Sequence, residues 1–385
     1  MPLFLLIFFV IYGGFHFYFY VKIKAAFSLS QAAGLGLIAI LLLMVLAPVI
    51  VHVSERYGYK ELARFMAYAG YLWMGGIFLF IASSLPLDLY RLFIHTGSLI
   101  SHRDLSYLGL SPQSALIVPL LVSLGINVFG YFEAKDIRTE KITIRSAKIP
   151  EAAGKIRIVQ ISDVHIGLIV RDERLKKILE EIKKAEPDIL VSTGDLVDGE
   201  INDLEEAQAQ LRDVHARYGK FAITGNHEFF AGIGKAVRFT QTAGFTVLQG
   251  EGVNVAGMIN IAGVDDPTGV RFGLVLPVSE KTMLAELPGG YFTILLKHQP
   301  LVDENATGAF DLQLSGHTHR GQIFPFNFIT GLYYRFQSGY FDLSNHARLY
   351  VSRGTGTWGP PIRFLSPPEI TVIDLVHDEN DGKND

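Results

Sequence analysis

The chain has 385 residues, more than one ordinary domain holds, with 34 basic and 38 acidic residues and a formal net charge of −4. Because the charge is slightly negative and the basic residues form no long cluster, the composition does not favour a nucleic-acid-binding protein. The chain contains no cysteine, which excludes disulfides and thiolate metal ligands.

Hydrophobic residues make up 49% of the chain, and they are concentrated in its first third. Residues 1–132 hold only seven of the 34 basic residues and four of the 38 acidic residues. Four apolar stretches in this region approach the roughly 20 residues that cross a bilayer core as a helix, near residues 2–21, 34–54, 67–87 and 112–132. Buried helices of a soluble domain are the alternative, but uncharged runs of this length favour a transmembrane region with four helices.

The first stretch lacks the charged start and small-residue cleavage site of a signal peptide, so we interpret it as a retained anchor. With four spans, the amino terminus and the residues after 132 share one side of the membrane. Basic residues are more frequent on that side, with Arg56, Lys60, Arg64, Lys135, Arg138 and Lys141 against Lys22, Lys24, Arg91 and Arg103. The bias favours the cytoplasmic side of the membrane, whereas a miscounted span would place the domain outside.

Residues 133–149 are expected to form a linker and an edge strand, because mixed charges give way to the alternating run KITIRSAKIP. From residue 150, apolar runs of strand length alternate with helical spacing at 172–185 and 203–216, which predicts a βαβαβ opening. Later strands are expected near 245–264, 291–297, 311–315, 348–353 and 369–376, with fewer helices between them. This second domain covers 150–376, and a polar, disordered tail follows at 377–385.

Five short polar blocks each follow a predicted buried strand, and they are Asp163-Val-His165, Gly194-Asp195-Leu-Val-Asp198, Gly225-Asn226-His227-Glu228, Lys297-His298-Gln299-Pro300 and Gly316-His317-Thr318-His319. Since sites in open α/β sheets lie at the carboxyl ends of the strands, we expect the blocks to meet at one edge. Their carboxylates, imidazoles and amide suit two divalent cations, which neutralise a phosphate ester and supply a nucleophile at neutral pH. Asp195 is the natural bridge between them. Oxygen and nitrogen ligands suit Mn, Fe, Zn, Co or Mg.

In this order the blocks resemble the calcineurin-like metallophosphoesterase superfamily, whose pattern is D-x-H, G-D-x-x-D, G-N-H-[DE], H and G-H-x-H. The resemblance covers roughly residues 150–376 and implies a mixed α/β (α+β) fold, a two-sheet αββα sandwich. The residues Gly316–Gln322 with Pro325, and Ser352–Gly356 with Pro367-Pro368-Glu369, are similar to a membrane-associated bacterial branch. That branch includes YkuE-like and YaeI-like phosphodiesterases and relatives that cleave UDP-2,3-diacylglucosamine.

The resemblance implies two metal ions, with Mn the leading choice. Asp163, His165, Asp195 and His319 would hold one ion, and Asp195, Asn226, His298 and His317 would hold the other. His227 is then free of metal, contacts the phosphate and helps the leaving oxygen depart. The catalytic residues are therefore expected to be His227, Asp195 and Asn226.

Other polar residues are expected to support this site. Asp198 is predicted to fix its loop by accepting backbone N–H bonds, and Glu228 either orients His227 or caps the following helix. Arg320 either reaches the substrate or lies on the surface. A second phosphate contact has four arginine candidates, namely Arg353, Arg271, Arg335 and Arg363.

Residues 323–341, IFPFNFITGLYYRFQSGYF, are rich in aromatic side chains and follow the last ligand block directly. One interpretation is a core strand with a packing loop. The other is an apolar lip that enters a membrane interface or holds acyl chains, extended by Trp358, Pro360 and Pro361.

We therefore predict a membrane-anchored dinuclear-metal hydrolase of a phosphodiester, phosphomonoester or pyrophosphate, acting by attack of a metal-bound hydroxide. Because an anchor confines the site to the plane of the lipids, an amphiphilic substrate is favoured, a lipid or a nucleotide-linked lipid such as UDP-2,3-diacylglucosamine. The alternatives are a hydrolase of soluble phosphodiesters and a non-catalytic binding or sensory membrane protein with the same fold. The sequence does not define an oligomeric state.

Overall fold

The computed structural model describes residues 2–199, 201 and 204–379. The chain divides into two compact units. The helical unit contains the residues up to Phe132 together with Gly359–Ile362, and the α/β unit contains Glu133–Trp358 and the residues from Arg363 onward. Of the tail predicted at 377–385, residues 380–385 lie outside the described residues, and His377 ends the last strand.

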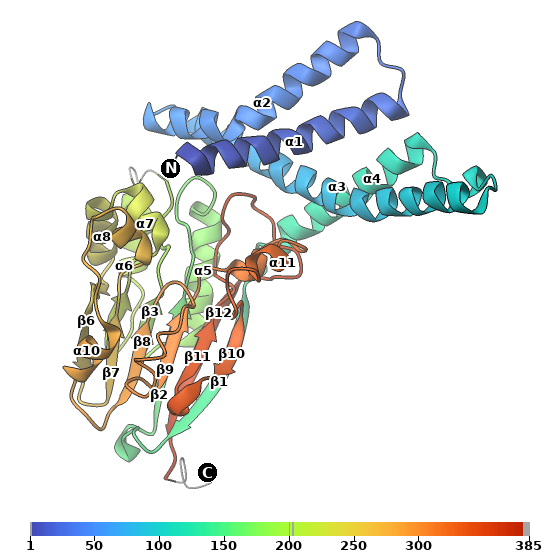
Figure 1. Ribbon diagram of the computed structural model, residues 1–385. Helices are drawn as coiled ribbons and strands as arrows, with labels where there is room; N and C mark the ends of the chain where they lie inside the picture. Colours follow the sequence, from blue (N-terminus) through green and yellow to red (C-terminus); the bar gives the residue numbers. More distant parts are fainter. Residues whose placement is uncertain (1, 200, 202–203, 380–385) are drawn as a thin grey trace. The chain divides into compact units, whose positions relative to one another are not determined.

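The helical unit consists of long apolar helices, as predicted. These are α1 (Pro2–Ala26), α2 (Gln31–Arg56), α3 (Lys60–Ser101) and α4 (Pro112–Glu133), with the short turn η1 (Ser106–Leu108) before α4 (Figure 1). In the described part of the chain, four helical segments are long and apolar enough to cross a membrane. At 42 residues, α3 is about 63 Å long, twice the bilayer core. It continues through Pro86 well past the span expected at 67–87, so only part of it can lie in a bilayer.

Small residues let these helices approach closely. A Cβ atom on Gly70 of α3 would lie 2.5 Å from the Cβ of Ala47 in α2, so only glycine fits there. Between α3 and α4, Ser123 Oγ donates to the Gly76 carbonyl at 2.6 Å. Close contact between small residues and hydrogen bonds between helices is typical of packing in membranes.

Polar side chains join α1 to α3. Trp73 Nε1 donates to His16 Nε2 at 2.8 Å, and the Lys22 ammonium lies 2.5 Å from the Asp88 carboxylate. The carboxyl end of α1 is therefore held beside the middle of α3.

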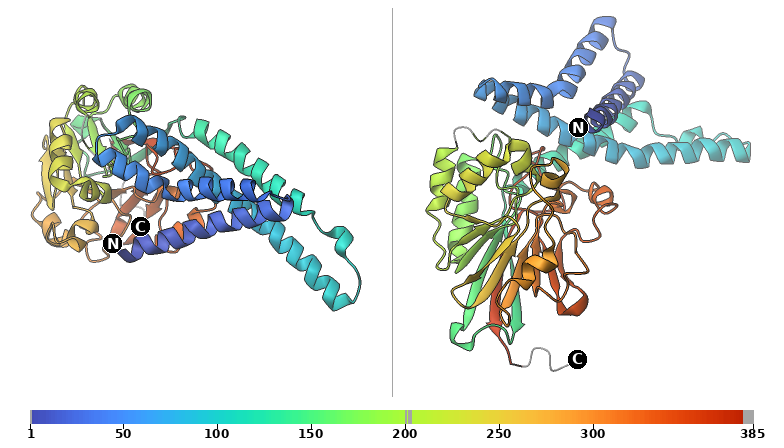
Figure 2. Two further views of the ribbon diagram at one scale, coloured as in Figure 1. Left: turned by 90° about the horizontal axis from the view of Figure 1, so that it is seen from above. Right: turned by 60° about the vertical axis from the view of Figure 1, so that its left-hand side comes forward.

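The α/β unit contains two mixed sheets in its described residues (Figures 1 and 2). The first runs β1 (Arg138–Ser146), β12 (Glu369–His377), β2 (Lys155–Ile161), β3 (Ile189–Ser192), β4 (Lys220–Ala222), β5 (Thr246–Val247). The second runs β10 (Gly339–Asp342), β11 (Arg348–Val351), β9 (Leu312–Ser315), β8 (Phe292–Leu296), β7 (Ile259–Gly263), β6 (Glu251–Val255). Strand β10 begins inside the aromatic segment and was not predicted as a separate strand.

Helices flank the two sheets. They are α5 (Asp172–Ala185), α6 (Glu205–Arg212), α7 (Asn226–Ala231), α8 (Ile233–Thr242), α9 (Pro267–Arg271), α10 (Glu280–Ala285) and α11 (Asn327–Thr330), with short turns η2 (Glu151–Ala153), η3 (His319–Gly321) and η4 (Ser344–His346). Strands β2, β3 and β4 are parallel and are joined through α5 and α6, which confirms the βαβαβ opening. Helix α6 is shorter than the expected 203–216, of which residue 203 lies outside the described residues.

The main core lies between the sheets. Ile158 and Val191 of the first sheet and Ile261, Ile294 and Leu314 of the second belong to one buried cluster. Outside the first sheet, α5 buries apolar residues at helical spacing, and outside the second sheet α10 and the segment 306–310 cover a smaller cluster. The unit is therefore a two-sheet sandwich with helical outer layers, the predicted α/β fold.

Candidate metal centre

The five polar blocks lie where buried strands end. Strands β2, β3 and β4 are parallel in the first sheet, as are β8 and β9 in the second, so their carboxyl ends emerge at one edge of each sheet. Three overlapping groups of described residues have possible ligand atoms within 4.8 Å of one another, and two of these groups combine residues from both sheets, so the two edges meet. The groups are Asp163, His165 and His319; His165, Asp195 and His227; and Asp195, His298 and His317.

Several residues of these loops have left-handed backbone conformations that favour glycine. The φ angles are 51° at Asp163, 53° at His165, 50° at Asp195, 70° at His317 and 47° at His319. Each costs about 1 kcal/mol or more, and such strain persists where the surroundings hold it in place. Here the loops bond to each other, because Asp163 N donates to the Gly194 carbonyl and His165 N to the Asp195 carbonyl, both at 3.0 Å.

The glycines of the motifs leave room for the polar side chains. A Cβ atom on Gly225 would lie 2.2 Å from Asp195 Oδ1, and one on Gly316 would lie 1.9 Å from Ser162 Oγ and 2.3 Å from Asp163 Oδ2. These are far shorter than normal contacts. Both glycines are therefore required by the close approach of a carboxylate from a neighbouring loop.

The first group of polar atoms joins β2 to β9. His165 Nε2 and His319 Nε2 lie 3.2 Å apart, and His319 Nε2 lies 3.4 Å from Asp163 Oδ1. All three side chains are buried. Two imidazole nitrogens and a carboxylate oxygen thus face one point, as ligands of a cation do.

The second group brings ligand atoms together around one imidazole nitrogen, Nε2 of His298. His298 Nδ1 donates to the Thr193 carbonyl at 2.7 Å, so a neutral ring leaves Nε2 bare. This atom lies 3.2 Å from Asp195 Oδ2, 3.3 Å from Asn226 Oδ1 and 3.2 Å from His317 Nδ1. A divalent cation among these atoms would satisfy all of them. The donor set therefore fits a metal ion.

The charges agree with this except at His298, where burial opposes protonation but the Asp195 carboxylate raises the pKa well above the usual value, so that a metal ion would displace a proton from this ring. Burial opposes ionisation of Asp195, but the imidazoles of His298 and His227 hold its pKa well below the usual value. Burial also lowers the pKa of His165 to about 3 and that of His317 to about 4. Ionised carboxylates and neutral imidazoles are the protonation states that metal ligands need.

His227 lies beside both groups but is bonded to a different carboxylate. Its Nδ1 lies 2.8 Å from Asp198 Oδ1, and its ring centroid lies 4.6 Å from that of His165. Burial acts against protonation, but the carboxylates of Asp195 and Asp198 raise the pKa of His227 to about 9. Asp198 therefore orients this imidazole and favours its charged form.

Glu228 has one of the two roles expected for it, the capping of α7, while Asp198 has the other, the orientation of His227. Glu228 is buried and accepts backbone N–H bonds from Gly225, Asp195, Leu196 and Val197. It caps α7 and fixes the loop after β3, the task predicted for Asp198. Neighbouring residues on a helix point in different directions, so Glu228 does not orient His227.

The candidate arginines differ in their surroundings. Arg320 is exposed, with only its backbone N–H bonded to Thr318 Oγ1 at 3.2 Å. Arg353 Nη2 lies 2.5 Å from Glu140 and 2.6 Å from Glu369. Arg363 is fully buried, donates to backbone carbonyls that include Gly356, and lies 3.0 Å from His319 Nδ1. The interpretation of Arg353 and Arg363 as phosphate contacts is therefore not supported, and both brace the loops around the site.

Two residues beside the centre were missed by the sequence analysis. Tyr334 Oη lies 2.8 Å from His317 Nε2 and donates to Gln299 Oε1 at 3.1 Å. Gln299 follows a ligand candidate directly in its block, which is a weak signal. Tyr334 belongs to the aromatic segment, where nothing distinguishes it from its neighbours.

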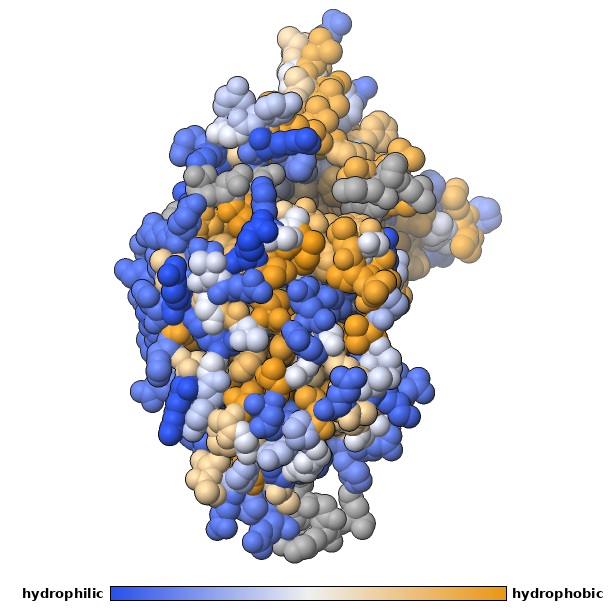
Figure 3. All heavy atoms as spheres, turned by 90° about the vertical axis from the view of Figure 1, so that its left-hand side faces the viewer, coloured by the Kyte–Doolittle hydropathy of each residue, from blue (hydrophilic) through white to orange (hydrophobic). Residues whose placement is uncertain are grey.

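The aromatic segment 323–341 runs into β10, a strand that is half-buried or exposed and not part of the core. The rest of the segment, the aromatic loop (residues 323–338), is largely turns and the short helix α11. Phe328 is 66% exposed, Leu332 82% and Tyr333 81%. Apolar residues also reach the surface among hydrophilic ones on a different face, the left-hand side of Figure 1 (Figure 3). Such exposure does not stabilise a soluble domain, so an apolar partner is the physical expectation for this loop.

Comparison with known proteins identifies the family. Residues 156–321 match the family model described as calcineurin-like phosphoesterase. An uncharacterized metallophosphoesterase of Aquifex aeolicus is 36% identical, over 66% of this chain and 98% of the relative. The uncharacterized metallophosphoesterase YkuE of Bacillus subtilis is 36% identical, over 65% of this chain and 90% of the relative. A Danio rerio transmembrane protein with metallophosphoesterase domain is 30% identical, over 67% of this chain and 62% of the relative.

The chain therefore belongs to the calcineurin-like metallophosphoesterase family. It is a metal-dependent phosphoester hydrolase that uses divalent metal ions and acts on a substrate containing phosphate. Its four long apolar helical segments, found in the described residues, indicate a membrane protein.

Proposed function

We propose that this protein is a membrane-anchored hydrolase with two metal ions at the shared edge of its sheets. Asp163, His165 and His319 would hold one ion, and Asn226, His298 and His317 the other, with Asp195 between them. The observation that carries this assignment is the position of Asp195, whose Oδ2 lies 3.2 Å from His298 Nε2 and 3.9 Å from His165 Nε2. One carboxylate thus belongs to both groups.

When bound, the ions would neutralise the phosphoryl oxygens and supply a nucleophile at neutral pH. The protein's own residues do the rest. Asp198 holds Nδ1 of His227, so Nε2 is the nitrogen left to donate a proton to the leaving oxygen. The exposed guanidinium of Arg320 follows the last ligand and would bind a phosphoryl oxygen. Mn is the proposed metal, and Fe, Zn, Co and Mg have the same ligand preferences.

The proposed substrate is amphiphilic, a lipid phosphate or a nucleotide-linked lipid such as UDP-2,3-diacylglucosamine. Two features support this. Long apolar helices would confine the site to the membrane plane, and the exposed aromatic loop follows the last ligands along the chain. The slightly acidic charge gives no support for nucleic acid as a substrate.

We also propose that the α/β unit lies on the cytoplasmic side of a bacterial inner membrane. Four crossings would return the chain to the side of its amino terminus, where basic residues are more frequent. In a four-crossing topology, the first and third crossings end on the same side of the membrane. The Lys22–Asp88 ion pair supports this topology, because it holds the end of α1 beside α3 near residue 88, where the third crossing would end.

A turnover assay on the purified full-length protein tests the proposal. With Mn added, we expect hydrolysis of bis-p-nitrophenyl phosphate and faster hydrolysis of at least one member of a panel of lipid phosphates and nucleotide-linked lipids. The variant Asn226→Ala should lose about 100-fold or more of both activities. Activity on soluble diesters alone would refute the lipid substrate, and a protein that binds two ions without any turnover would point to the non-catalytic alternative.

A further inference from the structure

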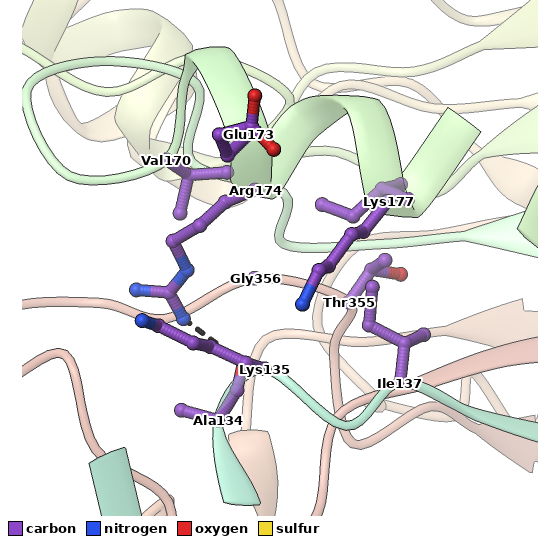
Figure 4. A pocket seen from close by; sticks show the side chains of 10 residues that line it. Ala134, Lys135, Ile137, Val170, Glu173, Arg174, Lys177, Thr355 and Gly356 are labelled. Carbon is purple, nitrogen blue, oxygen red and sulfur yellow. Dashed lines mark hydrogen bonds between the residues drawn. The ribbon is translucent and has the colours of Figure 1, made fainter. Parts of the chain in front are cut away.

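A small cavity in the α/β unit has none of the proposed metal ligands in its lining. Its volume is about 140 Å³, and it is lined by Ala134, Lys135, Ile137, Val170, Glu173, Arg174, Lys177, Ile178, Thr355 and Gly356 (Figure 4). These residues come from the segment after α4, from the start of α5 and from the loop after β11. None of the residues proposed to hold metal is among them.

The cavity is lined by an excess of positive charge. Lys135, Arg174 and Lys177 bring three cationic groups, against the single carboxylate of Glu173. Arg174 Nη2 donates to the Ala134 carbonyl at 3.0 Å, which fixes the guanidinium beside the segment that follows α4. In Figure 4 the side chains of Lys135 and Arg174 lie at the left and that of Lys177 at the right, and the Glu173 carboxylate lies above all three. Proteins commonly bind a phosphate group with several cationic side chains that converge on it.

The size and the place of the cavity limit its ligand. Sites for whole drug-sized ligands measure roughly 300–1,000 Å³, so this one admits only a head group. Lys135 stands two residues after Glu133, the last residue of α4, and is therefore within about 7 Å of the end of that helix along the chain. If α4 crosses the membrane, the cavity lies at the head-group layer whatever the orientation of the two units.

We propose that this cavity binds the phosphate head group of an anionic lipid. The site is distinct from the metal centre, and its ligand would not be hydrolysed there. Each basic residue near an anionic bilayer raises the affinity for that bilayer about fivefold. A lipid is favoured over free phosphate, because the tether keeps the cavity at the membrane surface where lipid phosphates are concentrated.

Titration calorimetry on the detergent-solubilised full-length protein tests this. The probes are dihexanoyl phosphatidylglycerol, dihexanoyl phosphatidylcholine and inorganic phosphate at low salt. We expect the anionic lipid to bind tightest. The double variant Lys135→Gln/Lys177→Gln should weaken it about 25-fold. The matched variant Lys176→Gln/Lys183→Gln, which changes two exposed lysines of α5 outside the cavity, should bind within twofold of the wild type.

Other outcomes overturn the proposal. Equal weakening by both double variants would show a non-specific charge effect. Inorganic phosphate binding as tightly as the lipid would show an ion site without a lipid. Loss of lipid binding in Asn226→Ala would place the lipid at the metal centre, whereas retained binding supports a separate cavity, even if the proposed catalysis fails.

A second inference concerns Tyr334 and rests on the proposed metal centre. Gln299 Nε2 donates to Asp266 Oδ2 at 2.8 Å, and a carboxylate accepts hydrogen bonds only. The amide of Gln299 therefore turns its oxygen toward Tyr334, whose hydroxyl donates its one proton there. Nε2 of His317 must then donate to the Tyr334 oxygen. Nδ1 of His317 keeps its lone pair, and this is the atom 3.2 Å from His298 Nε2.

We infer that Tyr334 is a positioning residue that fixes His317 as a metal ligand through Nδ1. Partners that orient ligand imidazoles change metal affinity by about 10–100-fold when removed. In Tyr334→Phe we therefore expect one of two ions to bind 10–100-fold more weakly, measured by metal content after dialysis against graded chelator. Tyr333→Phe, which changes the exposed neighbour, should keep both ions.

Wild-type affinity for both ions in Tyr334→Phe would refute the inference alone. A wild-type protein that binds no ions would instead refute the metal centre itself. The two failures are thus distinguishable without any activity measurement.

Discussion

Replacing Gly225 by alanine should disable the metal centre through a single methyl group. The added Cβ would lie 2.2 Å from Asp195 Oδ1 and 2.6 Å from the Asp195 backbone nitrogen. Non-bonded heavy atoms normally lie roughly 3.5 Å apart, so the carboxylate must move by about 1 Å. The φ of Gly225 is −105°, which alanine adopts freely, so the effect is steric and not conformational. A 1 Å displacement in a catalytic site costs about 100-fold in rate.

The assay compares Gly225→Ala with Gly289→Ala, whose Cβ would meet nothing within 4 Å. We expect the first variant to lose about 100-fold in kcat/KM on bis-p-nitrophenyl phosphate and to retain less metal, while its melting transition stays cooperative. The second should match the wild type. If Gly225→Ala kept two ions and full turnover, the placement of Asp195 between the two ligand groups would be wrong.

Three other substitutions test three different parts of the molecule. Asp198→Asn removes the carboxylate that holds the leaving-group imidazole, so kcat should fall about 100-fold or more while metal content stays unchanged; a changed metal content would contradict this role. Arg157 lowers the pKa of the Asp374 carboxyl by hydrogen bonding. The pair therefore stabilises the fold fully above the pKa of about 4 that the carboxyl has in the unfolded chain, and this stabilisation is lost as the pH falls through the lower pKa of the folded state. Asp374→Asn should therefore cost up to about 1 kcal/mol at pH 7, seen as a lower Tm, and nothing in strong acid; a pH-independent loss would refute the ion-pair explanation. Leu332→Ser should reduce kcat/KM about tenfold on a lipid phosphate but not on a soluble diester, whereas the similarly exposed Leu276→Ser should change neither.

The positions of the polar blocks could be predicted because each follows a buried strand. An apolar run identifies the strand, and the residues after it must lie at the edge of a sheet, as Asp163 and His298 do. The regularity of secondary structure carries this information over long distances in sequence. No detailed side-chain geometry is needed for it.

Contacts that depend on side-chain direction could not be predicted in the same way. Asp198 and Glu228 are both carboxylates near His227, and only the rotation of α7 decides which one reaches the imidazole. The partnership of Tyr334 with His317 depends on the path of an irregular loop. Similarly, hydropathy does not show where α3 ends, because a proline such as Pro86 is tolerated inside helices of this kind.

Each proposed ion would take ligands from both halves of the sandwich. The loops after β2, β3 and β4 supply Asp163, His165, Asp195 and Asn226, and the loops after β8 and β9 supply His298, His317 and His319. The cations would then act as cross-links that fasten one sheet to the other. Metal availability in the cell would govern the lifetime of the folded enzyme against proteolysis as well as its catalytic rate.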